Sequence, residues 1–191
     1  MHLLSALEVP AGDGAAAVDL AQTPAEIVLL SAADSELAAL ARAHARLGDA
    51  APGLRLANLL RLAHPLSVDL YLDAVAAHAR LIVVRLLGGR SYWSYGLDQL
   101  AALARERGIL LACLPGDDRP DPELAAASTL PAAEARRLWR YLSEGGLDNA
   151  GQALRYAASL LGADVRAPSS PDEATRARRA EAGPLGSSPA A

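Results

Sequence analysis

Acidic, basic, imidazole and aromatic side chains in this sequence follow apolar runs, an arrangement that could bind a flat ligand carrying carboxylates. The densest group is the glycine-aromatic loop, residues 88–96, in which two glycines precede Tyr92, Trp93 and Tyr95. The chain has two Trp, five Tyr and no Phe, so three aromatic residues within four positions are a marked concentration. Large rings beside flexible backbone suit ligand contact and core packing equally well, and the sequence leaves both open.

Residues after the other apolar runs complete a predicted ligand-binding rim. The rim residues are Asp34, His64, Gly88, Gly89, Arg90, Tyr92, Trp93, Tyr95, Asp117 and Asp118. In an open parallel sheet, ligands bind beyond the carboxyl ends of the strands, so these residues would share one edge. Four polar members also have a structural interpretation: Asp34 as a helix cap, His64 as a loop histidine held by backbone, and Asp117 with Asp118 in a turn. The sequence assigns no catalytic residue.

Several kinds of chemistry are excluded or weakened by what the sequence contains. All 18 basic residues are arginines, so a lysine nucleophile or Schiff base cannot form. The single cysteine, Cys113, and the spacing of the four histidines predict neither a disulfide nor a metal site. No P-loop, G-x-G-x-x-G or G-x-S-x-G motif occurs, which weighs against ATP hydrolysis, dinucleotide chemistry and α/β-hydrolase chemistry. We expect this chain itself to bind no cofactor.

The charge and hydropathy of the sequence indicate which classes of partner and which cellular compartment to expect. The formal net charge is −4 and the arginines are scattered among acids, so no nucleic-acid partner is expected. No apolar stretch approaches the roughly 20 residues that span a bilayer, and no secretory leader pattern begins the sequence. We therefore expect no membrane partner and a cytoplasmic location.

Apolar runs of strand length alternate with segments of helical period, which is typical of a parallel sheet covered on both faces. The predicted strands are residues 2–7, 26–32, 54–60, 81–87 and 109–114. The predicted fold class is α/β, an open and mostly parallel sheet with helices on both faces, Rossmann or flavodoxin-like, followed by C-terminal helices. Arg85 lies inside the fourth run, where its charge needs a carboxylate partner or a route to the rim.

Capping residues and glycines set the bounds of the predicted helices. Asp34 and Ser67 are expected to cap two of them. Thr23 and Glu26 have capping-box spacing, but β-branched residues follow, so a strand is favoured there. The predicted helices are residues 34–47, 67–79, 96–107, a short one from Asp121, 131–145 and 149–161.

Composition divides the chain into two parts. Residues 1–162 are expected to form one α/β domain. Residues 163–191 are rich in Ala, Pro, Ser, Arg and Glu and contain few large apolar groups. Such a segment cannot repay its ordering entropy, so a disordered low-complexity tail is predicted.

Four long segments together resemble one known family, the CobN-type large subunit of cobaltochelatase, which is related to the large subunit of magnesium chelatase. The segments are residues 19–34, 56–69, 85–96 and 114–121, in the same order and spacing as in the N-terminal region of that subunit. The resemblance covers about residues 1–162. It is specific because long consecutive motifs match, rather than one short pattern.

This resemblance implies a part in inserting cobalt into hydrogenobyrinic acid a,c-diamide, a corrin, during aerobic cobalamin biosynthesis. In the family, the large subunit holds the ring, and two smaller subunits, one of them an AAA+ ATPase, complete the complex that uses cobalt and ATP. The implied partners are the remainder of the large subunit, the two smaller subunits and the corrin substrate. Family members are several times longer, so the chain is expected to be a truncated or fragmentary piece that is inactive alone.

Two other classes of function remain open at this point. One is a free-standing flavodoxin-like module that binds FMN or a corrinoid, and the other is a scaffold without catalysis of its own. The corrinoid-binding motif D-x-H-x-x-G does not occur in the sequence. FMN-binding loops are rich in Ser and Thr after the first strand, where this chain has Glu8, Val9 and Pro10.

Overall fold

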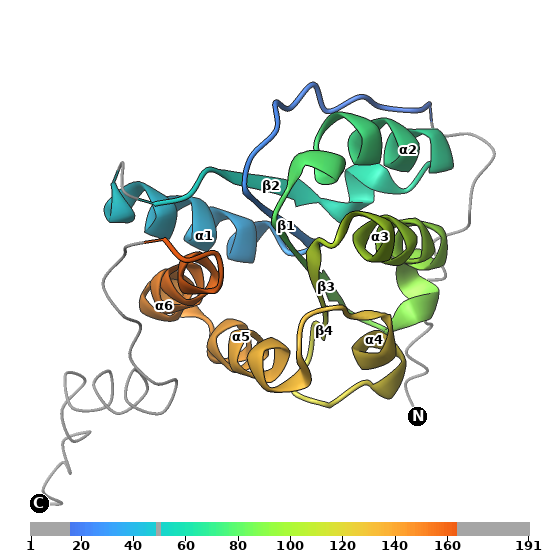
Figure 1. Cartoon of the computed structure of the whole chain (residues 1–191). Helices are drawn as coiled ribbons and strands as arrows, with labels where there is room; N and C mark the ends of the chain where they lie inside the picture. Colours follow the sequence, from blue (N-terminus) through green and yellow to red (C-terminus); the bar gives the residue numbers. More distant parts are fainter. Residues whose placement is uncertain (1–15, 49–50, 164–191) are drawn as a thin grey trace, which may run out of the picture.

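The computed structural model describes residues 16–48 and 51–163, which form a four-stranded parallel sheet between two layers of helices (Figure 1). This arrangement confirms the predicted α/β fold class. The strands are β1 (Ile27–Ser31), β2 (Leu54–Asn58), β3 (Leu81–Leu86) and β4 (Leu110–Pro115). The predicted strand at residues 2–7 and the predicted tail from residue 164 onward lie outside the described residues.

The strand order is β2-β1-β3-β4, and all neighbouring pairs run parallel. Ile27 of β1 is in register with Leu54 of β2 on one side and Leu81 of β3 on the other. The chain therefore moves outward from β1 to β2 and then returns to the opposite side of β1. In open α/β sheets, a reversal of this kind opens a crevice at the carboxyl ends of the two central strands, here β1 and β3.

Each layer of helices covers one face of the sheet (Figure 1). The layer of α1 (Asp34–Leu47), α5 (Ala132–Glu144) and α6 (Gly146–Leu160) packs on one side. The layer of α2 (Pro65–Ala74), α3 (Ser94–Arg107) and α4 (Pro122–Ala127) packs on the other. Short 3-10 helices, η1 (Leu59–Leu62), η2 (Ala76–His78) and η3 (Arg90–Trp93), join these elements.

Side chains of the central strands pack into two separate hydrophobic cores, one on each face of the sheet. In β3, Ile82 and Val84 pack with the α2 and α3 layer, whereas Leu81 and Val83 pack with the α1 and α6 layer. Every residue of β1 and β3 is buried because both faces of the sheet are covered. This is why the strands appear in the sequence as uninterrupted apolar runs rather than as alternating patterns.

Two predicted helix caps were wrong. Asp34 is the first residue of α1 rather than its cap, and its Oδ1 accepts a hydrogen bond from Asn58 Nδ2 at 2.6 Å. α2 begins at Pro65, because His64 Nδ1 accepts from the Leu66 amide at 3.1 Å and caps the helix. Ser67 lies inside α2, which ends at Ala74 and gives way to η2, short of the predicted end at residue 79. Proline fits the first helical position since its missing amide hydrogen is not needed there.

The other predicted bounds hold to within a few residues. α3 ends at the left-handed Gly108, as expected, and α4 is capped by Asp121, whose Oδ1 accepts from the amides of Glu123 and Leu124. The segment from Thr23 to Glu26 leads into β1, which confirms that its capping-box pattern is a false match. α6 begins at Gly146, three residues before its predicted start. None of the helices among the described residues is long and apolar enough to cross a membrane.

Candidate functional site

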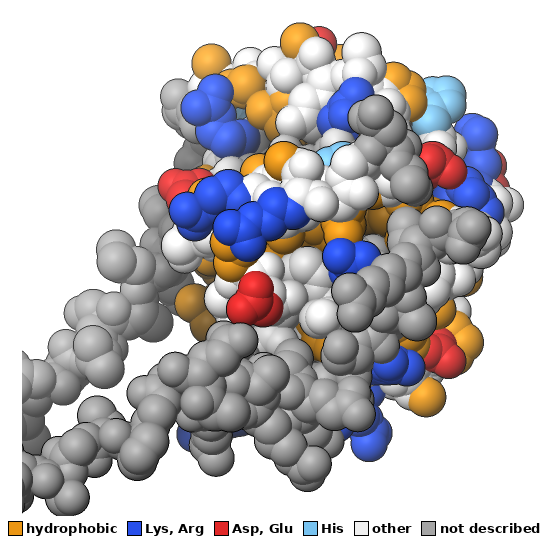
Figure 2. Space-filling model, turned by 90° about the vertical axis from the view of Figure 1, so that its left-hand side faces the viewer, with side chains coloured by type: hydrophobic (Ala, Val, Ile, Leu, Met, Phe, Trp, Pro, Cys, Tyr) orange, Lys and Arg blue, Asp and Glu red, His pale blue; other side chains and the backbone are white. Residues whose placement is uncertain are grey.

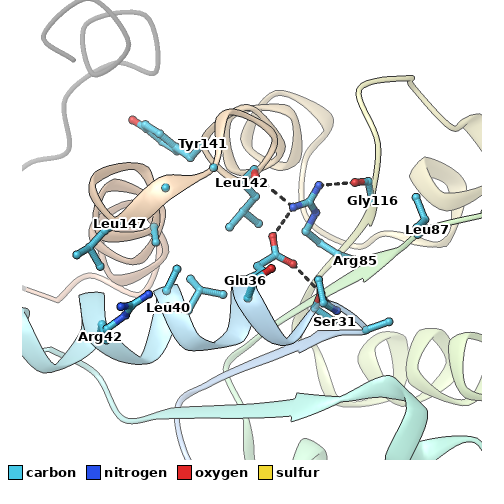
Figure 3. A pocket seen from close by; sticks show the side chains of 17 residues that line it. Ser31, Glu36, Leu40, Arg42, Arg85, Leu87, Gly116, Tyr141, Leu142 and Leu147 are labelled. Carbon is cyan, nitrogen blue, oxygen red and sulfur yellow. Dashed lines mark hydrogen bonds and ion pairs between the residues drawn. The ribbon is translucent and has the colours of Figure 1, made fainter. Parts of the chain in front are cut away.

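A cleft of about 550 Å³ lies at the crevice predicted by the strand order (Figure 3). The ends of β1 and β3 and the segment after β4 form its floor, and α1 and the junction of α5 with α6 form its walls. Its polar lining residues include Ser31, Glu36, Arg42 and Arg85, and its larger apolar ones are Leu40, Leu87, Tyr141, Leu142 and Leu147.

A buried ion pair crosses the floor of the cleft. Arg85 Nη1 pairs with Glu36 Oε1, and Ser31 Oγ donates to Glu36 Oε2 at 2.6 Å (Figure 3). Arg85 Nη2 also donates to the Gly116 carbonyl at 3.0 Å, and Nη1 donates to the Leu142 carbonyl at 3.2 Å. The expectation that Arg85 needs a carboxylate partner is therefore confirmed.

Through Arg85, this network connects four parts of the fold. Arg85 is only 7% exposed, so its charge would be costly without the Glu36 carboxylate and the carbonyl oxygens around it. Since both Glu36 oxygens already have partners in the protein, the network suits the positioning of β3, α1, α5 and the segment after β4. Arg42, by contrast, is exposed at the cleft wall.

The glycine-aromatic loop divides its rings between the core and the surface. Trp93 is 7% exposed, and its Nε1 donates to the Leu62 carbonyl at 2.8 Å. A Cβ at position 96 would lie 2.1 Å from the Trp93 ring, so Gly96 leaves the space that the indole fills. Tyr92 and Tyr95 are exposed, and Tyr95 Oη donates to Asp69 Oδ1 of α2 at 2.8 Å, which raises the pKa of Tyr95. Core packing thus accounts for Trp93, and surface contact stays open for the two tyrosines.

The other rim residues of this loop, Arg90, Gly88 and Gly89, have structural roles. Arg90 Nη2 pairs with Asp98 Oδ1 of α3 at 2.6 Å. Gly88 and Gly89 have φ angles of +95° and +73°, which other residues rarely adopt. A Cβ on Gly89 would also lie 2.9 Å from Asp121 Oδ2.

The last two rim residues follow β4. The Asp117 carbonyl accepts from Trp139 Nε1 at 3.0 Å, and Asp117 Oδ1 accepts from the Arg119 amide at 3.2 Å. Asp118 is exposed. Asp117 therefore has the turn role that its sequence allows.

All ten predicted rim residues follow strands at the carboxyl edge, but none of them lines the cleft. Their role in ligand binding stays a prediction. Four cleft residues, Ser31, Glu36, Leu87 and Gly116, are not among the ten predicted rim residues, although Ser31, Leu87 and Gly116 lie in loops at the predicted edge. Glu36 gave a usable signal, because a carboxylate at the start of the helix after one central strand can reach an arginine at the end of the next.

Neither a metal centre nor an activated thiol is built from the described residues. No group of three or more His, Cys, Asp or Glu side chains among them could hold a metal ion. Burial raises the pKa of the Cys113 thiol to about 12, despite opposing effects from Ser128 and Arg105. A thiol of this kind is a buried core group at neutral pH.

Two curated proteins with similar sequences are both aerobic cobaltochelatase subunits CobN. The chain is 52% identical over 172 residues to the aerobic cobaltochelatase subunit CobN of a Sinorhizobium species, covering 90% of this chain and 13% of that protein. It is 55% identical over 169 residues to the same subunit of Pseudomonas aeruginosa PAO1, covering 86% and 13%. No family model matches the chain.

The chain belongs to the CobN family. It corresponds to the N-terminal region of CobN, and it spans about 13% of the length of these curated relatives. The resemblance found in the four sequence segments is therefore confirmed.

A solved cobaltochelatase structure has a similar fold. The catalytic subunit of cobaltochelatase from Mycobacterium tuberculosis matches with a TM-score of 0.60 and 28% identity, over 76% of this chain and 11% of that one. Membership in the CobN family favours a segment of a large subunit over a free-standing flavodoxin-like module. The α/β architecture alone would have fitted either class, because one fold hosts many functions.

Proposed function

We propose that this chain supplies the N-terminal α/β domain of a CobN-type large subunit and acts in the insertion of cobalt into a corrin, hydrogenobyrinic acid a,c-diamide. The observation that carries the proposal is identity of 52–55% to two aerobic cobaltochelatase CobN subunits over 86–90% of the chain. Cobalt is the substrate metal of this reaction. The proposed partners are the remainder of the large subunit and two smaller subunits, one an AAA+ ATPase that would hydrolyse ATP, in the cytoplasm.

The domain's own part in this complex is to position other components. Its buried polar network at the cleft, Arg85 with Glu36 and Ser31, is satisfied within the chain and ties the sheet to both α1 and α5. A rigid sheet with fixed loops at one edge is a scaffold of the kind that holds binding surfaces in place. The proposed corrin contacts are the charged rim residues, among them Arg90, whose guanidinium would exchange its exposed partner Asp98 for a ring carboxylate.

A chimeric subunit tests the proposal. The matching segment of the Pseudomonas aeruginosa CobN is replaced by this chain, and the chimera is combined with the two smaller subunits, ATP, cobalt and the corrin. Formation of the cobalt corrin is followed by its absorption spectrum. The chimera should insert cobalt, whereas the subunit lacking this segment and the isolated chain should not.

Two results would contradict the proposal. One is a folded chimera that is no more active than the subunit lacking the segment, and the other is cobalt insertion by the isolated chain with the two smaller subunits. The rim is tested in the active chimera with Arg90→Ala, which should weaken corrin affinity. The matched control is Arg80→Ala, because Arg80 forms an exposed ion pair with Glu26 at the opposite end of the sheet.

A further inference from the structure

The exposed large hydrophobic side chains of the described residues all lie at one edge of the domain. This apolar edge consists of Leu60, Leu66, Leu70, Leu87, Tyr92 and Tyr95. They follow the carboxyl ends of β2 and β3, on η1, α2, η3 and the start of α3. Leu87 is 62% exposed and Leu60 54%, which is costly in water. Apolar surface gathered in this way is a mark of an interaction site.

A hydrogen bond and close packing link parts of the apolar edge to one another and to the cleft. Tyr95 Oη bonds to Asp69, which lies on α2 between Leu66 and Leu70. α2 and α3 lie side by side (Figure 1). Leu87 lines the cleft, and the segment after β4 approaches it so closely that a Cβ on Gly116 would lie 2.9 Å from the Leu87 amide. The edge therefore extends from the mouth of the cleft to α2.

Local structure fixes the backbone segments that carry the apolar edge, without any partner. Trp93 anchors the glycine-aromatic loop in the core, and the pair of Arg90 with Asp98 ties the same loop to α3. The His64 cap fixes the start of α2. A surface held in this way loses little conformational entropy when it binds.

Charge and chain length indicate what covers the apolar edge. Two charged groups beside it already have partners, since Asp69 accepts from Tyr95 and Arg90 pairs with Asp98, while Arg61 beside Leu60 is exposed. Most of the edge therefore suits an apolar protein surface. The chain spans about 13% of its CobN relatives, so most of their polypeptide is covalently attached to this region. Covalent attachment gives a high effective concentration, which lets a modest apolar surface stay docked.

We propose that the apolar edge is the surface on which the remainder of the CobN-type large subunit docks. This inference rests on the proposed function, because it requires the chain to be one part of that subunit. The remainder presents an apolar surface that covers the leucines of α2 and the two tyrosines. The face on the α1 and α6 side differs, because basic and acidic side chains are scattered over it among apolar ones (Figure 2).

Hydroxyl-radical footprinting of the chimeric subunit tests the proposal. Modification of Leu66, Leu70, Tyr92 and Tyr95 is compared by mass spectrometry between the chimera and the isolated chain. These side chains should be several-fold less modified in the chimera, without added corrin or partner subunits. Equal modification in both proteins would overturn the proposal.

A variant that introduces charge on the apolar edge gives a second test of the docking proposal. Leu66→Glu with Leu70→Glu should restore modification of Tyr92 and Tyr95 in the chimera. The control, Ala41→Glu with Ala45→Glu, adds the same charges at the same helical spacing on the exposed side of α1 and should leave the tyrosines protected. If the glutamates prevent folding, judged by urea unfolding of the isolated chain, the milder pair Leu66→Gln with Leu70→Gln replaces them. Protection that persists in a folded variant would count against the docking surface.

Other occupants give different results, each of which would overturn the proposal. Protection that develops only when corrin is added assigns the edge to the substrate. Protection of the isolated chain that disappears on dilution assigns it to a second copy. The cobalt-insertion assay reports separately on the proposed function: an active chimera with an unprotected edge refutes only the docking surface.

Discussion

A methyl group added at position 96 should measure how tightly the domain packs around Trp93. An alanine Cβ at this position would lie 2.1 Å from the Cε2 and Cζ2 atoms of the indole. Gly96 lies inside α3 and does not use the left-handed region, so its cost of substitution is steric. The ring cannot easily move aside, because it is 7% exposed and bonds to the Leu62 carbonyl.

The expected magnitudes follow from two opposing effects. Overpacking a core typically costs about 1–3 kcal/mol, and replacing an interior helical glycine with alanine gains up to about 1 kcal/mol. Gly96→Ala should therefore lower the free energy of unfolding by about 1–2 kcal/mol. Trp93→Ala should lower it by about 3–5 kcal/mol, the usual result of emptying a large aromatic site.

The double variant gives the sharper result. With the indole removed, the new methyl group has space, so Gly96→Ala in the Trp93→Ala background should be neutral or stabilising by up to about 1 kcal/mol. The change of sign is an interaction energy between two residues in contact. Urea unfolding of the chain, followed by far-ultraviolet circular dichroism, measures all four proteins without relying on Trp93 fluorescence.

Gly151→Ala in α6 is the matched control. No atom lies within 4 Å of its added Cβ, so this substitution should stabilise the chain in both backgrounds. The packing argument is refuted if Gly96→Ala costs the same with and without Trp93. It is also refuted if Gly96→Ala stabilises the native sequence as Gly151→Ala does.

Two further predictions concern buried groups. Arg85→Met leaves the Glu36 carboxylate without its arginine partner and should lower the free energy of unfolding in urea by about 3–5 kcal/mol. Adding Glu36→Leu should recover part of that loss. Equal stability of the single and the double variant would contradict this prediction. Cys113, whose pKa burial raises to about 12, should resist thiol reagents at pH 8 until the chain unfolds. The stability from its neutral form is complete below about pH 9 and is lost as the pH rises towards 12, so Cys113→Ala should reduce alkaline destabilisation.

The sequence predicted the strands better than the starts of the helices. Burial on both faces produces continuous apolar runs, which depend on no particular partner, so β1 and β3 were found to within one residue at each end. Helix starts depend on which nearby side chain reaches a free amide. His64 rather than Ser67 makes that bond for α2, and Asp34 bonds to Asn58 of β2 instead of capping α1.

The candidate site was predicted only in part. All ten predicted rim residues follow strands at the carboxyl edge, but the cleft is lined by their neighbours, and ligand binding by the ten stays a prediction. Leu87 and Gly116 carry no chemical signal in a sequence, since one is a common apolar residue and the other a common turn residue. Their importance comes from a close approach between the ends of β3 and β4.

By itself, the sequence determined the class of fold and the family. Apolar strand-length runs that alternate with helical segments predict a parallel sheet, because helices on both faces then bury the strands. Four long motifs together indicated the CobN family. The tertiary structure alone decided that Arg85 pairs with Glu36, 49 positions away, that Trp93 is core while Tyr92 and Tyr95 are surface, and that β1 and β3 are neighbours. Local patterns record which side chains must be buried, whereas pairing between distant segments depends on how the helices and strands pack together.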